Sequence, residues 1–376
     1  MRLLTPDQAL TAAAARAGAS NFGPRDFDAA LDRTLSELGR VPFTSKAFDD
    51  AMSRVVSDLA TRARIEAWYE AHPEAEAQAI EGPVLVCGMP RTGTTATVGM
   101  LALDERFRFL RAWEAMAPIP PPVAGYEESD PRLIAARARA SQYEKPEMHI
   151  HDPNGPEEDL VFLAGLSMRS FHGALPMSRE YMQWWIDEDF SSTYAYNARV
   201  MKMLQSQRPP SLWLIKAPPH LFKLIAFARE FPQAKFVMTH RDPLKIIPSA
   251  ASLHHRLHQA RCVPDSINKH EIGSRLLELW QEGIRRGLAA RAVIGEDRFI
   301  DVRNDDVVKR PIQTFSRIYE HIGLPFREDL KVRIEEYSRR NKPGAFGEHV
   351  YTLSEYGLSA AGINAAFSDY IERFLQ

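Results

Sequence analysis

The chain of 376 residues is 45% apolar and 26% charged, proportions typical of a soluble globular protein. Its formal net charge of −2 excludes a global field that would favour nucleic acid or an anionic membrane surface. Two cysteines, Cys87 and Cys262, are too few for a disulfide framework or a thiolate-rich zinc site, so a reducing, cytoplasmic location is expected. No apolar run approaches the ~20 residues that a membrane span requires.

Residues 1–80 are expected to form a helical N-terminal extension. Thr5 followed by Pro6 is typical of a helix start, with a capping hydroxyl and a first-turn proline. The stretches 25–40 and 48–74 then repeat apolar residues at helical spacing. The pattern changes at Pro83, and a second unit is expected to begin at residue 81.

Residues 81–376 are predicted to form an α/β domain with a P-loop-type central parallel sheet flanked by helices. Short, continuous apolar runs alternate with helical patterns, and such runs are typical of strands buried on both faces of a parallel sheet. Ligands bind such sheets at the carboxyl ends of the strands. The runs are residues 84–87, 212–215, 236–238 and 299–302, and the helical patterns are residues 219–230, 243–258, 274–294 and 310–322.

Two further segments are assigned from pattern alone. Residues 118–210 are mainly helical after a proline-rich turn, and we expect an insertion that shapes an acceptor pocket. Its aromatic residues Trp184 and Trp185 are expected in the core rather than in a pocket wall. Residues 344–376 predict a glycine-containing loop and then one last helix.

The first apolar run leads directly into a phosphate-binding loop at residues 88–95. A glycine turn between a strand and a helix directs backbone N–H groups and the positive helix end at an anion. The spacing almost matches the nucleoside-triphosphatase loop, but Thr94 stands where that loop has lysine. Arg91 supplies a cation instead, which suits a phosphosulfate with no obligatory magnesium. The alternative is a plain connecting loop whose threonines, Thr94 and Thr95, cap the helix.

A second anion site is predicted after the run at 236–238. Asp242 and Pro243 fit the N-cap and the first position of a helix, which places Arg241 beside the helix start. Ser249 lies further along the same helix and adds a hydroxyl. The alternative is a capped surface helix with an exposed arginine.

The phosphate loop and the Arg241/Ser249 pair together resemble the PAPS-dependent sulfotransferase family. The resemblance implies that the loop holds the 5′-phosphosulfate of 3′-phosphoadenylyl sulfate (PAPS), while Arg241 and Ser249 hold its 3′-phosphate. It also implies a sulfuryl transfer to a hydroxyl acceptor, with PAPS as co-substrate and no metal. The implied loop residues are Arg91, Thr92, Gly93, Thr94 and Thr95, and the stretches 218–220, 239–243 and 347–358 are similar to a bacterial branch of the family.

Sulfuryl transfer requires a base near the acceptor hydroxyl and a cation near the leaving phosphate. Glu114 is the first candidate base, because several branches of the family have a catalytic glutamate at a similar place. Its apolar neighbours Trp113 and Met116 favour a raised pKa. The alternative is a helix-surface glutamate paired with Arg111.

His151 is the second candidate base, since histidine is the usual base in the cytosolic branch; a solvated loop histidine is the alternative. Lys216 ends the run at 212–215, where a family lysine contacts the bridging oxygen, and His220 either supports it or begins the next helix. The remaining histidines of interest fit a solvated helix face better than a zinc site, so no metal is predicted. These are His254, His255 and His258.

The leading hypothesis is therefore a PAPS-dependent sulfotransferase acting on a small-molecule hydroxyl acceptor, with no nucleic-acid partner. A P-loop nucleotide kinase or hydrolase is the first alternative, and the threonine at position 94 argues against it. A non-catalytic nucleotide-binding protein is the second, and Glu114 with Lys216 argues against that. The acceptor and the oligomeric state stay open, with lipophilic alcohols, phenols, carbohydrates and lipid head groups all possible acceptors.

Overall fold

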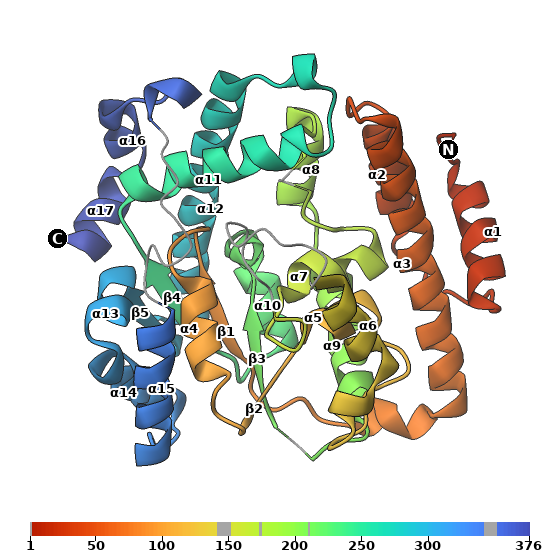
Figure 1. Ribbon diagram of the computed structural model, residues 1–376, viewed down its shortest axis with the longest axis horizontal. Helices are drawn as coiled ribbons and strands as arrows, with labels where there is room; N and C mark the ends of the chain where they lie inside the picture. Colours follow the sequence, from red (N-terminus) through yellow and green to blue (C-terminus); the bar gives the residue numbers. More distant parts are fainter. Residues whose placement is uncertain (1, 141–151, 173–174, 210, 342–351) are drawn as a thin grey trace.

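A computed structural model describes residues 2–140, 152–172, 175–209, 211–341 and 352–376. A five-stranded parallel sheet lies at its centre in the order β2-β3-β1-β4-β5 (Figure 1). The predicted parallel α/β sheet is confirmed, with one strand that the sequence pattern did not predict, β2. The strands are β1 (Val84–Gly88), β2 (Phe107–Phe109), β3 (Leu212–Lys216), β4 (Lys235–His240) and β5 (Phe299–Arg303).

Alternate apolar residues of β1, β3, β4 and β5 enter two separate cores, one on each face of the sheet. In β1, Leu85 and Cys87 enter the larger core, while Val84 and Val86 enter the smaller one. Successive side chains of a strand point to opposite faces. A strand covered on both faces therefore needs apolar residues throughout, which explains the continuous apolar runs.

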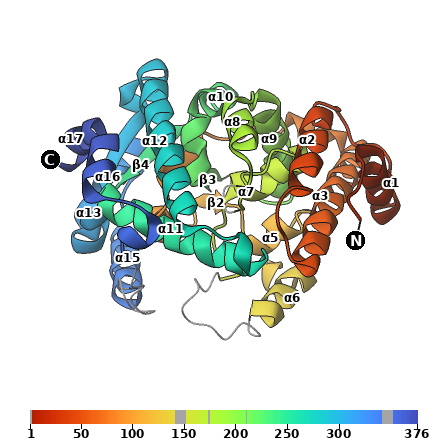
Figure 2. The ribbon, with the colours of Figure 1, turned by 90° about the horizontal axis from the view of Figure 1, so that it is seen from above.

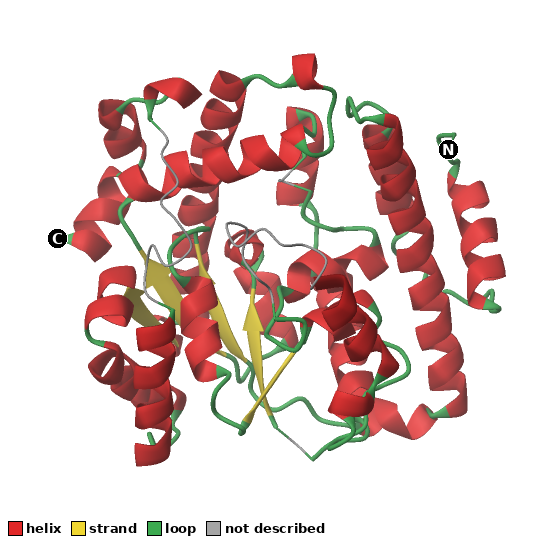
Figure 3. Cartoon of the chain, viewed as in Figure 1, coloured by secondary structure: helices red, strands yellow, loops and turns green. Residues whose placement is uncertain are grey.

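Helices cover both faces of the sheet, as the sequence predicted (Figure 3). The larger core contains residues of α9 (Ser191–Gln205), α10 (Leu224–Glu230) and α12 (Lys269–Ile294). The smaller core contains residues of α4 (Thr94–Leu101), α14 (Pro311–Ile322) and α15 (Glu328–Arg340). The pattern at 219–230 divides into a 3-10 turn, Pro218–Phe222, and α10.

The N-terminal region contains the helices α1 (Pro6–Ala17), α2 (Asp28–Leu38) and α3 (Ser45–Ala71). Thr5 caps α1, and its hydroxyl accepts from the amide of Gln8. These helices pack around a third core, yet α3 also contributes Ile65 and Tyr69 to the larger core of the sheet. The division at residue 80 and the insertion at 118–210 stay predictions.

Helix α11 (Pro243–Gln259) connects the two sides of the molecule. Figure 2 shows it running from the C-terminal helices α16 (Ala360–Ala366) and α17 (Ser368–Leu375) toward α2 and α3. Beyond its end, the amide of Thr44 donates to the carbonyl of Arg261 at 2.9 Å, and the amide of Val263 donates to that of Pro42 at 3.0 Å. The N-terminal region is thereby joined to the helix that follows β4.

The remaining α-helices are short, and several lie within the predicted insertion. The C-terminal prediction of one last helix is wrong, because α16 and α17 are two helices separated at Phe367. Over the described ranges, the structure has no helix with both the length and the apolar character to cross a bilayer. The other helices are α5 (Ala112–Met116), α6 (Pro131–Ala140), α7 (Asp159–Phe162), α8 (Arg179–Asp187) and α13 (Asn304–Lys309).

Candidate functional site

The phosphate loop joins β1 to α4 and contains two residues in the left-handed conformation. Gly93 has φ 93° and Arg91 has φ 65°. Gly93 suits this left-handed conformation, and a Cβ atom added there would lie 2.2 Å from Nδ2 of Asn304, so a larger residue would also displace the Asn304 side chain. The first-turn amides of α4 have no intrahelical acceptor, so they are the groups of this loop that suit the predicted anion.

Three predicted threonines of the loop have different environments. Thr92 is fully buried, and its hydroxyl donates to the carbonyl of Met89 at 2.7 Å and lies 2.6 Å from the hydroxyl of Thr239 in β4. Thr94 is buried and Thr95 is exposed. The Thr92 side chain therefore supports the loop from within, which leaves Thr95 as the solvent-facing hydroxyl.

The structure brings the two predicted anion sites together. Nε of Arg91 donates to Oγ of Ser249 at 3.1 Å, and Nη1 of Arg241 donates to the carbonyl of Arg91 at 3.0 Å. Asp242 caps α11 as predicted, since its carboxylate accepts from the amide of Leu244 at 2.9 Å. Two cationic side chains and a hydroxyl thus converge from loops after β1 and β4.

Tyr370 of α17 contacts the backbone of Arg241 through its hydroxyl group. The amide of Arg241 donates to the Tyr370 hydroxyl at 3.3 Å, and Nδ1 of His240 lies 3.2 Å from the same oxygen. Nε2 of His240 lies 2.7 Å from Oδ1 of Asp301, while burial lowers the pKa of this histidine. The C-terminal helix therefore supports the strand end that carries Arg241.

Lys216 ends β3 and is only 3% exposed. The β3 register pairs it with Val86, so its Cα lies beside the strand that leads into the phosphate loop. Its Nζ donates to Oε1 of Glu158 at 2.9 Å, and the side chain of Glu158 is 28% exposed. The sheet edge next to the loop thus carries an ammonium group and a carboxylate in contact.

His220 fixes the neighbouring helix α7 rather than facing solvent. It is fully buried, with Nε2 2.9 Å from Oδ1 of Asp159 and Nδ1 2.8 Å from the hydroxyl of Tyr194. Asp159 directly follows Glu158. His220 therefore helps to hold the chain segment that pairs with Lys216.

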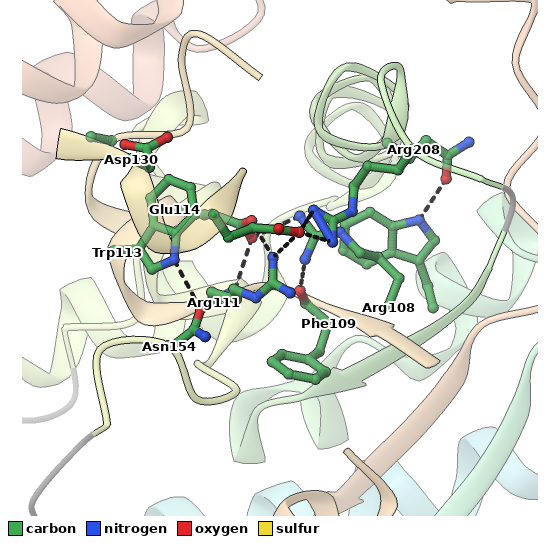
Figure 4. A network of polar contacts seen from close by, with 12 residues as sticks. Arg108, Phe109, Arg111, Trp113, Glu114, Asp130, Asn154 and Arg208 are labelled. Carbon is green, nitrogen blue, oxygen red and sulfur yellow. Dashed lines mark hydrogen bonds and ion pairs between the residues drawn. The ribbon is translucent and has the colours of Figure 1, made fainter. Parts of the chain in front are cut away.

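Glu114 is fully buried in a network of charged side chains (Figure 4). Its Oε2 accepts from Nη2 of Arg108 at 2.7 Å and from the amide of Arg111 at 3.0 Å. Its Oε1 accepts from Nη1 of Arg111 at 3.3 Å. Glu127 binds Arg111 and Arg208 within the same network. Both oxygens of the Glu114 carboxylate are therefore occupied by donors from Arg108 and Arg111.

His151 lies outside the described residues, as do residues 347–351 of the predicted tail. The imidazole rings of His254 and His258 are 6.4 Å apart. In the part of the chain that the structure describes, no three histidine, cysteine, aspartate or glutamate side chains gather in a way that would hold a metal.

Glu158, Thr239 and Asn304 contribute to the site without having been predicted. Thr239 belongs to the 239–243 stretch that resembles the bacterial branch of the family, and this resemblance is the signal that could have indicated it. Glu158 is the second of three consecutive acids, the last of which begins α7, and this pattern also describes an ordinary helix N-terminus. Its partner Lys216 is remote in sequence, and no local pattern marks that contact.

Comparison with known proteins gives the same family as the loop motif. The sequence model of the "Sulfotransferase family" matches residues 83–328. The omega-hydroxy-beta-dihydromenaquinone-9 sulfotransferase Stf3 of Mycobacterium tuberculosis is 23% identical over 270 residues, which cover 70% of this chain and 68% of that protein.

Two solved structures are similar over nearly the whole chain. The sulfotransferase STF9 from Mycobacterium avium has 29% identity and a TM-score of 0.91, over 98% of this chain and 96% of that one. The sulfotransferase STF1 from Mycobacterium tuberculosis has 26% identity and a TM-score of 0.84, over 98% and 99%. Since the family model spans well over half of the chain, and the fold agrees, the chain belongs to the sulfotransferase family and is an enzyme that transfers a sulfuryl group from a sulfonate donor to a hydroxyl acceptor.

Proposed function

We propose that the donor is PAPS and that the acceptor is a small lipophilic alcohol or phenol. The observation that carries the choice of donor is the contact between the two anion sites, through Arg91, Ser249 and Arg241. A nucleotide with phosphates on both its 5′ and 3′ positions needs two adjacent sets of donors. Guanidinium, hydroxyl and helix-terminal N–H groups are all donors and suit phosphate oxygens.

In this proposal the loop at 88–95 binds the 5′-phosphosulfate, with Arg91, Gly93, Thr94 and Thr95 around it and Thr92 as its internal support. Arg241 and Ser249 bind the 3′-phosphate. No magnesium is required, because the cations of Arg91 and Lys216 neutralise the charge that grows on the leaving phosphate. These assignments rest on the placement of the side chains around the loop.

We assign the base to Glu158 rather than to Glu114. The acceptor oxygen attacks sulfur, the bond from sulfur to the 5′-phosphate oxygen breaks, and the acceptor proton passes to the carboxylate of Glu158. Lys216 already binds Glu158, and the leaving oxygen offers it a second anionic partner when the donor is bound. Release of Glu158 from its ion pair would then leave its carboxylate oxygens available to the acceptor hydroxyl. His151 stays the alternative base.

The acceptor class is supported by a relative. Stf3 is named for a hydroxylated dihydromenaquinone, and we extend only its chemical class, a hydroxyl on a lipophilic molecule, to this chain. Cys87 and Cys262 are both free and buried, which supports the expected cytoplasmic location.

Donor binding is tested first by thermal unfolding with adenosine 3′,5′-bisphosphate, the nucleotide product. At ~100 times its Kd, a ligand adds about 2.7 kcal/mol of stability. We expect a shift of the midpoint with the bisphosphate, its loss in Arg241→Ala, and its retention in the control Arg303→Ala, an exposed arginine at the end of β5. Stabilisation by ADP with magnesium alone would instead favour a kinase or hydrolase.

Transfer is tested with ³⁵S-labelled PAPS and an acceptor panel that contains 2-naphthol, aliphatic alcohols, hydroquinones and sugars. We expect labelled sulfate esters from the lipophilic phenols or alcohols. Label only on sugars, or bisphosphate binding with no transfer to any member, would contradict the proposed acceptor class.

A further inference from the structure

The carboxylate of Glu114 closes the turn between β2 and α5. It accepts from the amide of Arg111, the N-cap of α5, and from the guanidinium of Arg108. Helix α5 has five residues, too few to be stable without outside support. Glu114 therefore determines the direction in which the chain leaves β2.

The first turn of α5 pairs with a segment that is remote in sequence. Residues 110–113 and residues 153–157 lie antiparallel, and we call these two segments together the clasp. Its hydrogen bonds run from the amide of Glu157 to the carbonyl of Leu110 at 2.8 Å, from Ala112 to Gly155 at 3.1 Å, from Trp113 to Pro153 at 3.0 Å, and from Trp113 Nε1 to Asn154 Oδ1 at 3.2 Å.

The clasp ends one residue before Glu158. Nothing but the peptide bond from Glu157 separates the last clasp hydrogen bond from the residue that binds Lys216. We propose that Glu114 is a positioning residue, which fixes the start of α5 and, through the clasp, holds Glu158 against Lys216. This inference rests on the proposed role of Glu158 as the base.

Burial and charge hold the guanidinium of Arg108 in place beside Glu114. Arg108 is 5% exposed and packs over the ring of Trp213 at 4.9 Å, so its guanidinium is held between β3 and Glu114. Removal of the carboxylate leaves a buried cation without its partner, which favours rearrangement of the turn. Glu114→Gln keeps a carbonyl oxygen that accepts from the amide of Arg111, so it should preserve much of the turn.

The kinetic test uses Glu114→Ala, Glu114→Gln, Glu158→Gln and the double variant Glu114→Ala/Glu158→Gln, with PAPS and 2-naphthol. We expect Glu114→Ala to lower kcat by about 10- to 100-fold, because small displacements of reacting groups have effects of this size. Glu114→Gln should recover most of that loss. The Kd of adenosine 3′,5′-bisphosphate should stay within about twofold in all four, since the anion sites are untouched.

Two readouts separate positioning from direct catalysis. The acid limb of the kcat–pH profile should persist in Glu114→Ala and disappear in Glu158→Gln, because only the base titrates there. In the double variant, kcat should equal that of Glu158→Gln, since there is no base left to misplace. Loss of the limb in Glu114→Gln would make Glu114 itself the base and overturn the inference.

Hydrogen exchange of the clasp amides tests the structural step without any acceptor. We expect faster exchange of the donor amides of the clasp, those of Ala112, Trp113 and Glu157, in Glu114→Ala than in the control Glu128→Ala, which breaks an exposed ion pair with Arg137 in the same region. Unchanged exchange in Glu114→Ala would overturn the inference whatever the kinetics show. Full kcat in Glu158→Gln, with faster exchange in Glu114→Ala, would refute the base assignment while leaving the clasp intact.

Discussion

At the scale of single residues, the side chains of the proposed donor site are held by partners that do not themselves face the ligand. Arg241 shows this most clearly, because its backbone amide binds the hydroxyl of Tyr370 while its guanidinium binds the phosphate loop. Its position therefore depends on the C-terminal helix as well as on β4. A substitution far from any phosphate can thus alter donor affinity.

Tyr370→Phe tests this dependence. It removes the hydroxyl that binds the Arg241 amide and lies against His240, and leaves the ring in place. A net hydrogen bond contributes about 0.5–1.5 kcal/mol, so the Kd of adenosine 3′,5′-bisphosphate should rise about 2- to 12-fold in calorimetry. A lower melting temperature with an unchanged Kd would show that Tyr370 supports the fold alone.

His258 gives a prediction for stability against pH. Burial lowers its pKa to about 4, and Nε2 has no hydrogen-bond partner among the described residues. Its ordinary pKa is 6.5, so the unfolded chain binds more protons than the folded chain between pH 6.5 and 4. As the pH falls through that window, protonation of this histidine in the unfolded chain therefore lowers the free energy of unfolding.

His258→Leu should remove the loss of stability that His258 causes at low pH. Between pH 7.5 and pH 5, the free energy of unfolding should fall by about 1–2 kcal/mol less in the variant than in the parent protein. Urea unfolding at both pH values measures the difference. An equal effect at the two values would show that the imidazole does not titrate in this window.

The sequence was informative where a residue's role depends on its near neighbours. Arg91, Arg241 and Ser249 follow strand ends or helix starts that are visible in the pattern, and the structure brings them together. Glu158 was missed because its importance comes from Lys216, a contact across 58 residues. Glu114 was predicted as a candidate site residue. Its contacts with two arginines depend on tertiary packing, which a sequence motif does not show.

At the scale of elements, the same distinction holds. The strands β1, β3 and β4 have the continuous apolar runs of doubly covered strands, whereas Asp301 interrupts the run in β5. By contrast, β2 has three residues and too short a run to show a period. Helix α15 buries only Leu330 and Ile334, so its sequence resembles a solvated segment. The clasp has one isolated antiparallel bridge and follows from packing, not from propensity.

The phosphate loop gives a prediction at this scale. Gly93→Ala adds a Cβ atom 2.2 Å from Nδ2 of Asn304 in a left-handed backbone, whereas Gly323, with φ 77°, has nothing within 4 Å of an added Cβ. Both substitutions carry a backbone cost of about 1 kcal/mol. Only Gly93→Ala should also weaken adenosine 3′,5′-bisphosphate binding, by about tenfold, because it displaces the Asn304 side chain that packs against the loop. Equal affinities in the two variants would contradict a phosphate role for this loop.

At the scale of the whole molecule, three cores are linked by shared elements. Helix α3 belongs to the N-terminal core and to the larger core of the sheet, and Cys262, just beyond α11, belongs to the N-terminal core. An element that contributes side chains to two cores couples the stability of one core to that of the other. The chain should therefore unfold as one unit, although the sequence suggested a boundary at residue 80.

Leu35→Ala tests the coupling, since Leu35 is 2% exposed in the N-terminal core. Such truncations typically cost about 2–5 kcal/mol. We expect tryptophan fluorescence and far-ultraviolet circular dichroism to report one coincident, lowered urea transition. A separate early transition confined to part of the signal would show that the N-terminal helices unfold independently.

Helix α11 begins beside the proposed 3′-phosphate site, and the chain just beyond its end forms the hydrogen bonds with Pro42 and Thr44. Its 17 residues span about 25 Å, so it links the proposed nucleotide site to the opposite flank of the protein. The evolution of that flank is therefore constrained by a site that it does not touch. Substitutions in residues 42–44 that shifted the position of α11 would weaken binding of the proposed nucleotide, even with every phosphate contact conserved.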